Sequence, residues 1–231
     1  MIRDRSSAIA EAMEGAAIAH TLARLHPALP FAEMRIISNS TGDRPRQHWD
    51  IPLAFRKLAE LTAAIKRIGD FEVSVTAYPE KHPESPTVDA DIDVLKAKVD
   101  AGATRAITQF FFDNDHYFRY LDRVRARGID IPIIPGLIPI HNFTQVAGFT
   151  AKCGATIPAA VAQRFEGLDG DDETTKLMAA TVAAEQVTEL AARGVDTFHF
   201  YTLNRANLVY AICHLLGLRP AGQNEPKQEA A

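Results

Sequence analysis

The sequence predicts an α/β protein in which parallel strands alternate with helices, as in one half of an eight-stranded barrel. From about residue 60 onward, short runs of β-branched and aromatic residues alternate with segments of helical period. Polar and aromatic residues gather just after these runs, where such barrels carry their sites. A doubly wound sheet is the alternative, but no GxGxxG turn follows any run, so the barrel is favoured.

Four runs have the character of strands. They are FEVSVTAY (71–78), RAITQFFF (105–112), IPIIPGLI (131–138) and DTFHFYTL (196–203). Two crossover helices are expected between the first three, because two sets of apolar residues recur with helical spacing and each is followed by a glycine suited to a left-handed cap. The two sets are Ile92, Leu95 and Val99 before Gly102, and Tyr117, Leu121 and Val124 before Gly128.

The third connection is longer and is expected to hold two helices. A short one contains Phe143, Val146 and Phe149, and a long Ala-rich one follows the acidic segment DGDDET (169–174), whose carboxylates suit a helix N-terminus. After the last strand, RANLVYAICHLLG (205–217) predicts a closing helix.

Residues 1–58 do not show this alternation of strand-like runs and helical segments. An Ala-rich stretch through Met13 and Leu22 suggests a helix and residues 34–37 a short strand, but RPRQHWDIP (44–52) has no clear period. Helical spacing resumes at residue 58. We therefore predict three regions: an N-terminal segment 1–58 that is helical or poorly ordered, a half-barrel domain 59–221, and a polar tail 222–231.

Composition narrows the class of protein. The chain has 231 residues, 47% hydrophobic and 23% charged, a net charge of −4 and a pI near 6.1. Scattered basic residues argue against a nucleic-acid partner, and no apolar run is long enough for a membrane helix. Acidic residues near the N-terminus are unlike a targeting peptide, so we expect a cytoplasmic protein. The two cysteines, Cys153 and Cys213, suggest neither a disulfide framework nor a metal site.

Each predicted strand leads into a segment with candidate site residues. AYPEKHPES (77–85) holds Tyr78, Glu80, His82 and Glu84; the alternative is a solvated turn shaped by its prolines. TQFFFD places Gln109 among three phenylalanines, and alternation puts Gln109 and Phe111 on one face. The Gln109 amide needs hydrogen-bond partners, either core neighbours or a heteroaromatic ligand.

The last two strands are followed by further candidates. In PGLIPIHNFTQ and the helix after it, Gln145 and Phe149 lie four residues apart, on one helical face, although Phe149 alone is typical of a core residue. Arg205 ends FHFYTLNR and is placed to neutralise an acidic substrate group; the alternative is a solvated arginine at a helix start.

Taken in order, AYPEKHPES, KVDAGATRAITQFFFD, PIIPGLIPIHNFTQ and FHFYTLNR closely resemble the methylenetetrahydrofolate reductase family over about residues 60–220. The resemblance implies the last four βα units of a TIM-type (β/α)8 barrel that binds FAD. It also implies the reduction of 5,10-methylenetetrahydrofolate to 5-methyltetrahydrofolate, in one-carbon metabolism and methionine biosynthesis. The hydride source would be NADH or NADPH, and the flavin would carry the chemistry.

The resemblance also implies roles for particular residues. Gln109 would face the flavin ring as the catalytic residue and contact the substrate. Phe149 would stack on folate or on the folded cofactor. FAD would be lined by Tyr78, His82, Ser85, Asp91 and Lys98, and folate would be bound by Gln109, Gln145, Phe149, Leu203 and Arg205.

The resemblance does not reach the family's first four strands. Their segment FEFFPP, which supplies a general acid, is not found in this sequence, and STGDRP (40–45) makes Asp43 a loose match to the family's flavin-side aspartate. A half barrel exposes two strand edges, so we expect a homo-oligomer or a complementing chain. A gene fragment or misread start, in which residues 1–58 are not family sequence, is favoured over one half of a split barrel.

Two rival functions are kept. One is a non-catalytic remnant or partner-binding module, which flavin content would distinguish from the reductase. The other is a metal-dependent hydrolase that uses His82, His141 and His199, but no HxH or HxxxH pair supports it.

Overall fold

The computed structural model describes residues 51–219 of the chain, with side chains from residue 57. The chain divides into two compact units after Leu61, and the second unit carries all the described strands. The described elements are α2 (Ile51–Ile68), β1 (Ser74–Ala77), α3 (Val88–Asp100), β2 (Arg105–Thr108), α4 (Asn114–Ala126), β3 (Ile133–Ile134), β4 (Gly136–Leu137), α5 (Phe143–Cys153), α6 (Ala159–Gln163), α7 (Asp172–Ala192), β5 (His199–Phe200) and α8 (Ala206–Leu215).

The strands form two small parallel sheets. β1, β2 and β3 are neighbours in that order, with Ala77 opposite Thr108, and β4 pairs with β5. Each of the four predicted runs contributes to a sheet. The predicted α/β class with parallel strands is thus confirmed.

Pro135 divides the third predicted strand. The prediction of one strand over residues 131–138 is wrong, because β3 pairs with β2 whereas β4 turns to the other side and pairs with β5. Proline has no N–H to continue a ladder. Its carbonyl accepts the N–H of His199 at 3.0 Å, and the N–H of Gly136 donates instead to the Thr108 hydroxyl at 2.9 Å.

The helices begin and end at residues with suitable caps. The side chains of Thr87, Asp113, Asn142 and Asp171 accept N–H groups in the first turns of α3, α4, α5 and α7, which stabilises each helix start. Gly102 and Gly128 follow α3 and α4 with φ of 108° and 68°, as predicted. Both values lie where a side chain would be strained.

Two differences from the predicted helices have simple causes. α6 is an additional helix in the third connection, and its five residues are too short to show a period. α2 begins at Ile51, within the segment that has no clear period, and Pro52 is tolerated in its first turn. Residues 1–50 and 220–231 lie outside the described residues, and with them the Ala-rich stretch, the short strand and Asp43.

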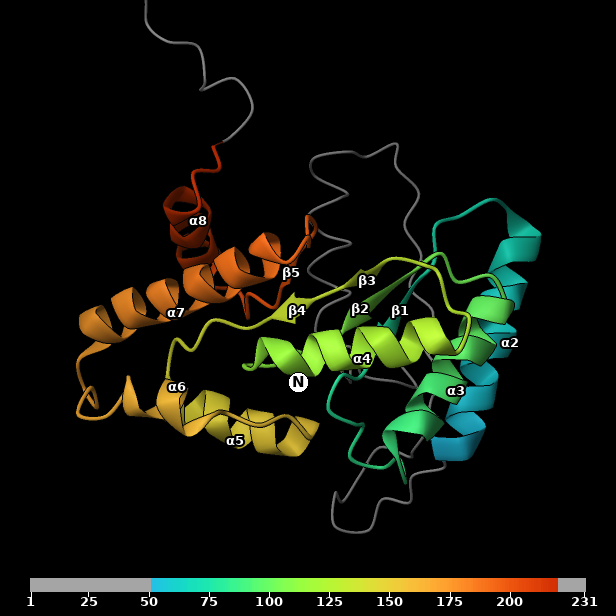
Figure 1. The fold of residues 1–231 in the computed structure, drawn as a ribbon, viewed down its shortest axis with the longest axis horizontal. Coiled ribbons are helices and arrows are strands. Elements are labelled where there is room, and N and C mark those ends of the chain that lie inside the picture. The colour runs from blue at the N-terminus through green and yellow to red at the C-terminus, as the bar shows by residue number, and fades with distance from the viewer. Residues whose placement is uncertain (1–50, 220–231) are drawn as a thin grey trace, which may run out of the picture. The chain divides into compact units, whose positions relative to one another are not determined.

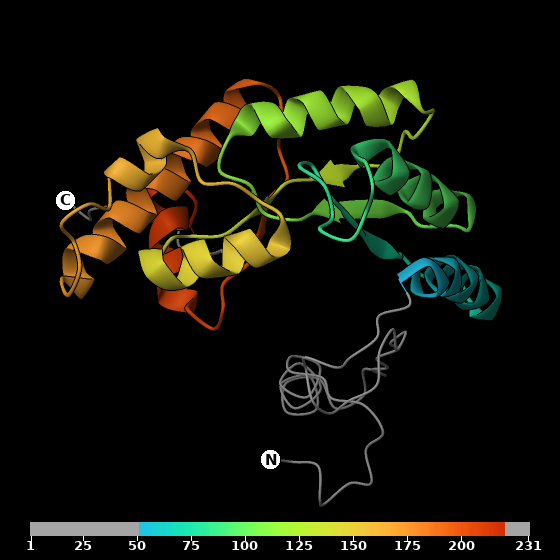
Figure 2. The ribbon, with the colours of Figure 1, turned by 90° about the horizontal axis from the view of Figure 1, so that it is seen from below.

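One core joins three helices to the strands. α3, α4 and α7 run alongside the sheets (Figures 1 and 2), and their apolar side chains pack in a single cluster with the strand residues. Burying each large side chain contributes about 1.5–3 kcal/mol. The cluster includes Ala77, Ala106, Ile133 and Leu137 from the strands, Ile92 and Leu95 from α3, Tyr117, Tyr120 and Val124 from α4, and Val187 and Leu190 from α7.

A second core lies beneath the segments that leave the carboxyl ends of the strands. It contains Phe110, Phe112, Ile138, Ile140, Val146, Phe165 and Ala179. These residues follow β2 and β4 or belong to α5, α7 and the segment after α6, so the core supports the loops in which the candidate residues occur. Among the described helices, none is both long and apolar enough to cross a membrane.

Candidate functional site

All the candidate residues except Gln109 form two groups near the carboxyl ends of the strands. The Lys98 cluster lies between the segment after β1 and α3 and consists of Tyr78, His82, Ser85, Asp91 and Lys98. The Arg205 pocket is a cavity of about 300 Å³ lined by His141, Gln145, Val146, Phe149, Leu203 and Arg205.

Asp91 holds the Lys98 cluster together. One carboxylate oxygen accepts the N–H of His82 at 2.8 Å, and the other accepts the hydroxyl of Ser85. Asp91, Ser85 and Lys98 are each no more than 5% exposed. The carboxylate therefore ties the segment after β1 to the first turn of α3.

Lys98 is a buried cation beside this carboxylate. Its ammonium group donates to the carbonyl of Thr76 at 2.9 Å. Burial lowers the pKa of Lys98 to about 8, and the Asp91 carboxylate acts in the opposite direction. An ammonium group has three protons to donate and is stabilised by an anion that reaches it.

The rings of Tyr78 and His82 meet edge to face, with centroids 4.9 Å apart. Burial lowers the pKa of His82, opposed mainly by Asp91 and Glu84, so the ring is neutral near pH 7. Its Nδ1 accepts the N–H of Glu84 at 3.1 Å. In the neutral ring the proton is then on Nε2, which is the donor.

The segment after β1 is held in place by side-chain hydrogen bonds and is not a solvated turn. The Glu80 carboxylate accepts the Thr156 hydroxyl at 2.6 Å and its N–H at 3.2 Å. The Lys81 ammonium donates to the carbonyls of His82 and Ser85 at 2.9 and 2.6 Å, in a residue with a strained φ of 138°. These contacts fix the positions of Tyr78 and His82.

Gln109 lies one residue beyond the end of β2. Its N–H donates to Ala77 at 2.7 Å, and its side-chain oxygen accepts the N–H of Phe110 at 3.1 Å. Gln109 is half-buried and lines, with Tyr78, Phe110 and Cys153, a crevice too narrow to hold a water molecule. β2 ends at Thr108, yet the predicted alternation of the phenylalanines continues beyond it: Phe111 packs in the first core against Tyr117 of α4, whereas Phe110 and Phe112 pack in the second.

The Arg205 pocket brings together residues from two distant parts of the sequence. Gln145 and Phe149 come from α5, and Leu203 and Arg205 follow β5. Leu203 has a φ of 46°, uncommon for a residue with a side chain, in the turn that brings it and Arg205 to the pocket. Four of the five folate residues implied by the resemblance therefore line one cavity, and Gln109 lies outside it.

Phe149 is not a core residue. It is 44% exposed, and its ring stacks on the buried ring of Phe110 with centroids 5.5 Å apart and planes at 28°. Because Phe110 also lines the crevice of Gln109, this stack links the Arg205 pocket to the crevice, which Tyr78 of the Lys98 cluster lines as well.

His141 is a pocket residue for which the resemblance implies no role. It also lines two cavities next to the Arg205 pocket. Its pKa is lowered by burial and by Arg205, while hydrogen bonds that the ring donates to the Pro139 carbonyl and to the Gln145 side chain act in the opposite direction. The only feature of the sequence that could have suggested a role for His141 is its position beside the cap residue Asn142.

Within the described residues, no three His, Cys, Asp or Glu side chains are grouped to hold a metal ion, so His82, His141 and His199 do not form the site that a hydrolase would need.

Comparison with known proteins agrees with the motifs. The 5,10-methylenetetrahydrofolate reductase of Escherichia coli strain K12 is 53% identical over 162 residues, which are 70% of this chain and 55% of that protein. The 5,10-methylenetetrahydrofolate reductase of Buchnera aphidicola subsp. Acyrthosiphon pisum is 47% identical over 69% of this chain and 54% of its own length. The probable methylenetetrahydrofolate reductase (NADH) of Oryza sativa subsp. japonica is 36% identical over 66% of this chain and 27% of its own length. The chain thus spans about half the length of these bacterial relatives and less than a third of the length of the plant relative.

A solved structure gives a weaker match. It is an uncharacterized protein from Clostridium thermocellum that binds two copies of 5-methyl-5,6,7,8-tetrahydrofolic acid, with a TM-score of 0.44 and 14% identity, over 66% of this chain and 57% of that one. The family model described as methylenetetrahydrofolate reductase matches residues 11–217, and so includes much of the segment before residue 59. The chain belongs to the methylenetetrahydrofolate reductase family.

Proposed function

We propose that this chain takes part in the flavin-dependent reduction of 5,10-methylenetetrahydrofolate to 5-methyltetrahydrofolate, with NADH or NADPH as the hydride source. The observation that carries the proposal is the Arg205 pocket, in which Gln145, Phe149, Leu203 and Arg205 converge. Its volume is at the lower end of the range of small-molecule sites. The activity named for the relatives supports the same reaction.

The pocket has the functional groups that a folate needs. Arg205 supplies a permanent cation for a carboxylate, and the Gln145 amide supplies both donors and an acceptor. The exposed Phe149 ring offers an apolar surface for an aromatic ring, already aligned by its stack on Phe110. These groups would bind and orient folate.

The Lys98 cluster is the proposed FAD site, and its residues fit an anionic cofactor. Lys98 has a buried ammonium group whose lowered pKa records its poor solvation, and a diphosphate would stabilise its charge. The His82 ring provides an N–H donor. A bound flavin would accept a hydride from the nicotinamide and pass it to the folate.

Gln109 is the proposed contact between these two sites. Its side-chain oxygen is held by Phe110, which leaves the NH₂ group as the donor toward a ligand. The crevice that it lines contains Tyr78 of the Lys98 cluster and Phe110, on which Phe149 of the Arg205 pocket stacks. We assign Gln109 the role of orienting the reacting ring.

The same proposal includes a TIM-type barrel, of which this chain supplies consecutive βα units. The parallel order β1-β2-β3 and β4-β5 fits consecutive βα units of a TIM-type barrel. In the described residues β1 pairs only with β2, and β5 only with β4. A second copy or a complementing chain would complete such a sheet, in a protein that we place in the cytoplasm.

The test is FAD titration of the purified chain, followed by absorbance at about 450 nm, where bound oxidised flavin absorbs. We expect stoichiometric binding, bleaching by NADH or NADPH without oxygen, and recovery of colour on addition of 5,10-methylenetetrahydrofolate. Lys98→Met should weaken FAD binding, whereas Lys152→Met, an exposed residue of α5, should not. Binding without bleaching would favour a non-catalytic remnant, and no FAD binding at any attainable concentration would refute the flavin proposal.

A further inference from the structure

The Lys81 ammonium group lies where three main-chain carbonyls converge. It donates to the carbonyl oxygens of His82 at 2.9 Å, Pro83 at 3.2 Å and Ser85 at 2.6 Å. Among the other described lysines, none donates to more than one carbonyl. Within the part of the chain that the structure describes, Lys81 has no carboxylate partner. We call residues 81–85 the Lys81 loop.

The main chain of this loop is strained at its first residue. Lys81 has a φ of 138°, a value that a residue with a side chain rarely adopts. Its carbonyl lies against Gly154, the residue after α5, where a Cβ atom would be only 2.8 Å from the Lys81 oxygen. Such a backbone conformation persists only where surrounding contacts impose it. The three ammonium contacts therefore hold the loop in a conformation that its backbone alone disfavours.

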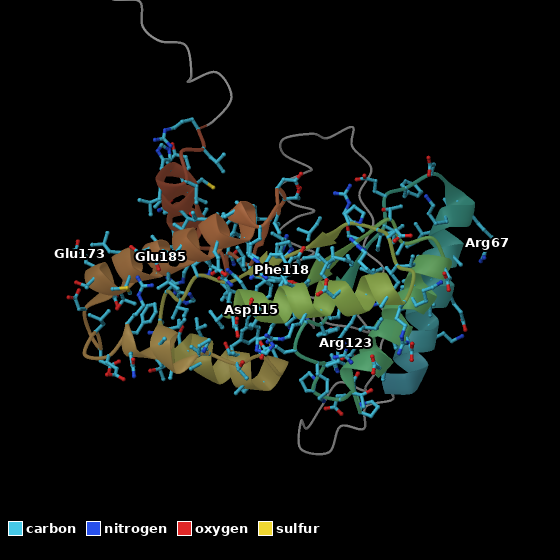
Figure 3. All side chains as sticks on the ribbon, in the orientation of Figure 1. Arg67, Asp115, Phe118, Arg123, Glu173 and Glu185 are labelled. Carbon is cyan, nitrogen blue, oxygen red and sulfur yellow. The ribbon has the colours of Figure 1, made fainter. Side chains whose placement is uncertain are left out.

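The Lys81 loop positions two residues of the proposed FAD site. The His82 N–H and the Ser85 hydroxyl both bind the Asp91 carboxylate on α3. α3 has its own support, because Arg123 of α4, labelled in Figure 3, donates to Asp89 in the first turn of α3 at 2.8 Å. The fit of His82 and Ser85 to Asp91 thus depends on the conformation of the loop.

Converging carbonyl oxygens are the ligands with which proteins bind monovalent cations. A lysine ammonium is a compact charge with three protons, which match the three carbonyls here one to one. Without a cation, three oxygen dipoles would face one another and the loop would spread over other conformations. A ligand that needs the ordered loop then binds less tightly, in proportion to the fraction of chains in which the loop is ordered.

We infer that Lys81 is a positioning residue for the proposed FAD site, in which its ammonium group acts as a built-in monovalent cation that orders residues 81–85. The inference rests on the proposed function. Lys81 acts on the cofactor through the main chain of the loop and not by contact with it. Deleting the side chain should therefore leave a site that a small alkylammonium ion can fill.

The experiment measures the FAD dissociation constant of two variants by titration of the full chain. Lys81→Met keeps much of the side-chain volume without the charge, whereas Lys81→Gly removes the side chain and tolerates the positive φ. We expect FAD to bind about tenfold more weakly to both, the effect of losing charge-assisted hydrogen bonds.

Added ions test the cation role directly. n-Butylammonium has the carbon chain and the ammonium group of the deleted side chain, and at about 0.1 M it should restore most of the FAD affinity of Lys81→Gly. Tetramethylammonium at the same ionic strength has the charge but no N–H donor, and should not. Neither ion should change the wild-type chain or Lys81→Met, in which the space is filled.

Two controls accompany these titrations. Lys152→Met, which removes an exposed cation from α5, should leave the FAD dissociation constant unchanged. Urea unfolding of each variant, with and without the ions, shows whether it is folded under the titration conditions. For a variant that does not fold alone, recovery of the unfolding transition in n-butylammonium but not in tetramethylammonium gives the same comparison.

The outcomes separate this inference from the proposed function. Wild-type FAD affinity in both Lys81 variants overturns the inference and leaves the proposed function standing. A loss of affinity that the two ions relieve equally, or that neither relieves, also overturns it, because the N–H donors of a cation would then not be what orders the loop. If the wild-type chain binds no FAD, the proposed function fails and the inference fails with it.

Discussion

The Tyr201 hydroxyl donates a hydrogen bond to the main-chain carbonyl of Thr108, at 2.9 Å and across 93 residues of sequence. Thr108 ends β2 and precedes Gln109, so this bond joins the end of β5 to the residue next to the proposed reacting position. The ring of Tyr201 also meets Phe110 edge to face. We therefore expect Tyr201 to hold Gln109 in position through its two chain neighbours.

Tyr201→Phe should lower the free energy of unfolding by about 1 kcal/mol, the worth of one such hydrogen bond. It should also weaken folate binding through displacement of Gln109. Urea unfolding and ligand titration measure the two effects. Tyr210→Phe, at an exposed position on α8, is the control and should change neither. An unchanged Tyr201→Phe protein would argue against this role.

Gly136→Ala should be strongly destabilising. A Cβ atom at Gly136 would lie 2.2 Å from the Thr108 carbonyl oxygen and 2.6 Å from the Tyr201 ring. Relieving this overlap requires a backbone shift, which typically costs about 1–3 kcal/mol or more.

Gly148→Ala provides the matched control. Gly148 lies within α5, and a Cβ there would meet nothing within 4 Å. Alanine should stabilise this helix by up to about 1 kcal/mol. Thermal unfolding of both variants measures the contrast, and equal effects would contradict the close packing at Gly136.

Lys98 should make stability depend on pH. Its pKa is about 8 in the folded chain, against 10.5 as the ordinary value, so between these pH values the unfolded chain binds the extra proton. Stability therefore rises with pH through this window. Relative to Lys98→Met, the wild-type chain should gain roughly 2 kcal/mol between pH 7 and pH 10. Parallel stability curves for the two proteins, from urea unfolding, would show that Lys98 is not a poorly solvated cation.

Arg205→Met should raise the pKa of His141. Burial is the larger cause of its lowered pKa, and the Arg205 cation is the next. Removing that cation leaves burial in place, so the pKa should rise without a change in fold. NMR titration of the His141 ring proton measures it, with Lys152→Met as control. An unchanged pKa would mean that Arg205 does not approach His141 in solution.

The local patterns in the sequence were good predictors. Ile92 and Leu95 are buried on the predicted face of α3, and Gly102 has the left-handed conformation expected after it. Gln145 and Arg205, for which the resemblance implies folate contacts, line one cavity, although their role stays a prediction.

The features that could not be predicted from the sequence depend on contacts between residues that are far apart in the chain. The run that contains Pro135 looks like one strand, and only its pairing with β2 on one side and β5 on the other divides it. His141 lines a cavity together with Arg205 and residues of α7, and no local pattern in the sequence predicts that these distant residues meet there. The bond between Ser85 and Asp91 likewise depends on how the segment after β1 folds back on α3.

The break at Pro135 leaves two strand ladders that meet at one residue. The Lys98 cluster rests on the ladder of β1, β2 and β3, whereas Leu203 and Arg205 extend from the ladder of β4 and β5. Thr108 bridges the ladders, through its hydroxyl to Gly136 and its carbonyl to Tyr201. A substitution at Thr108 would therefore be felt in both binding regions at once.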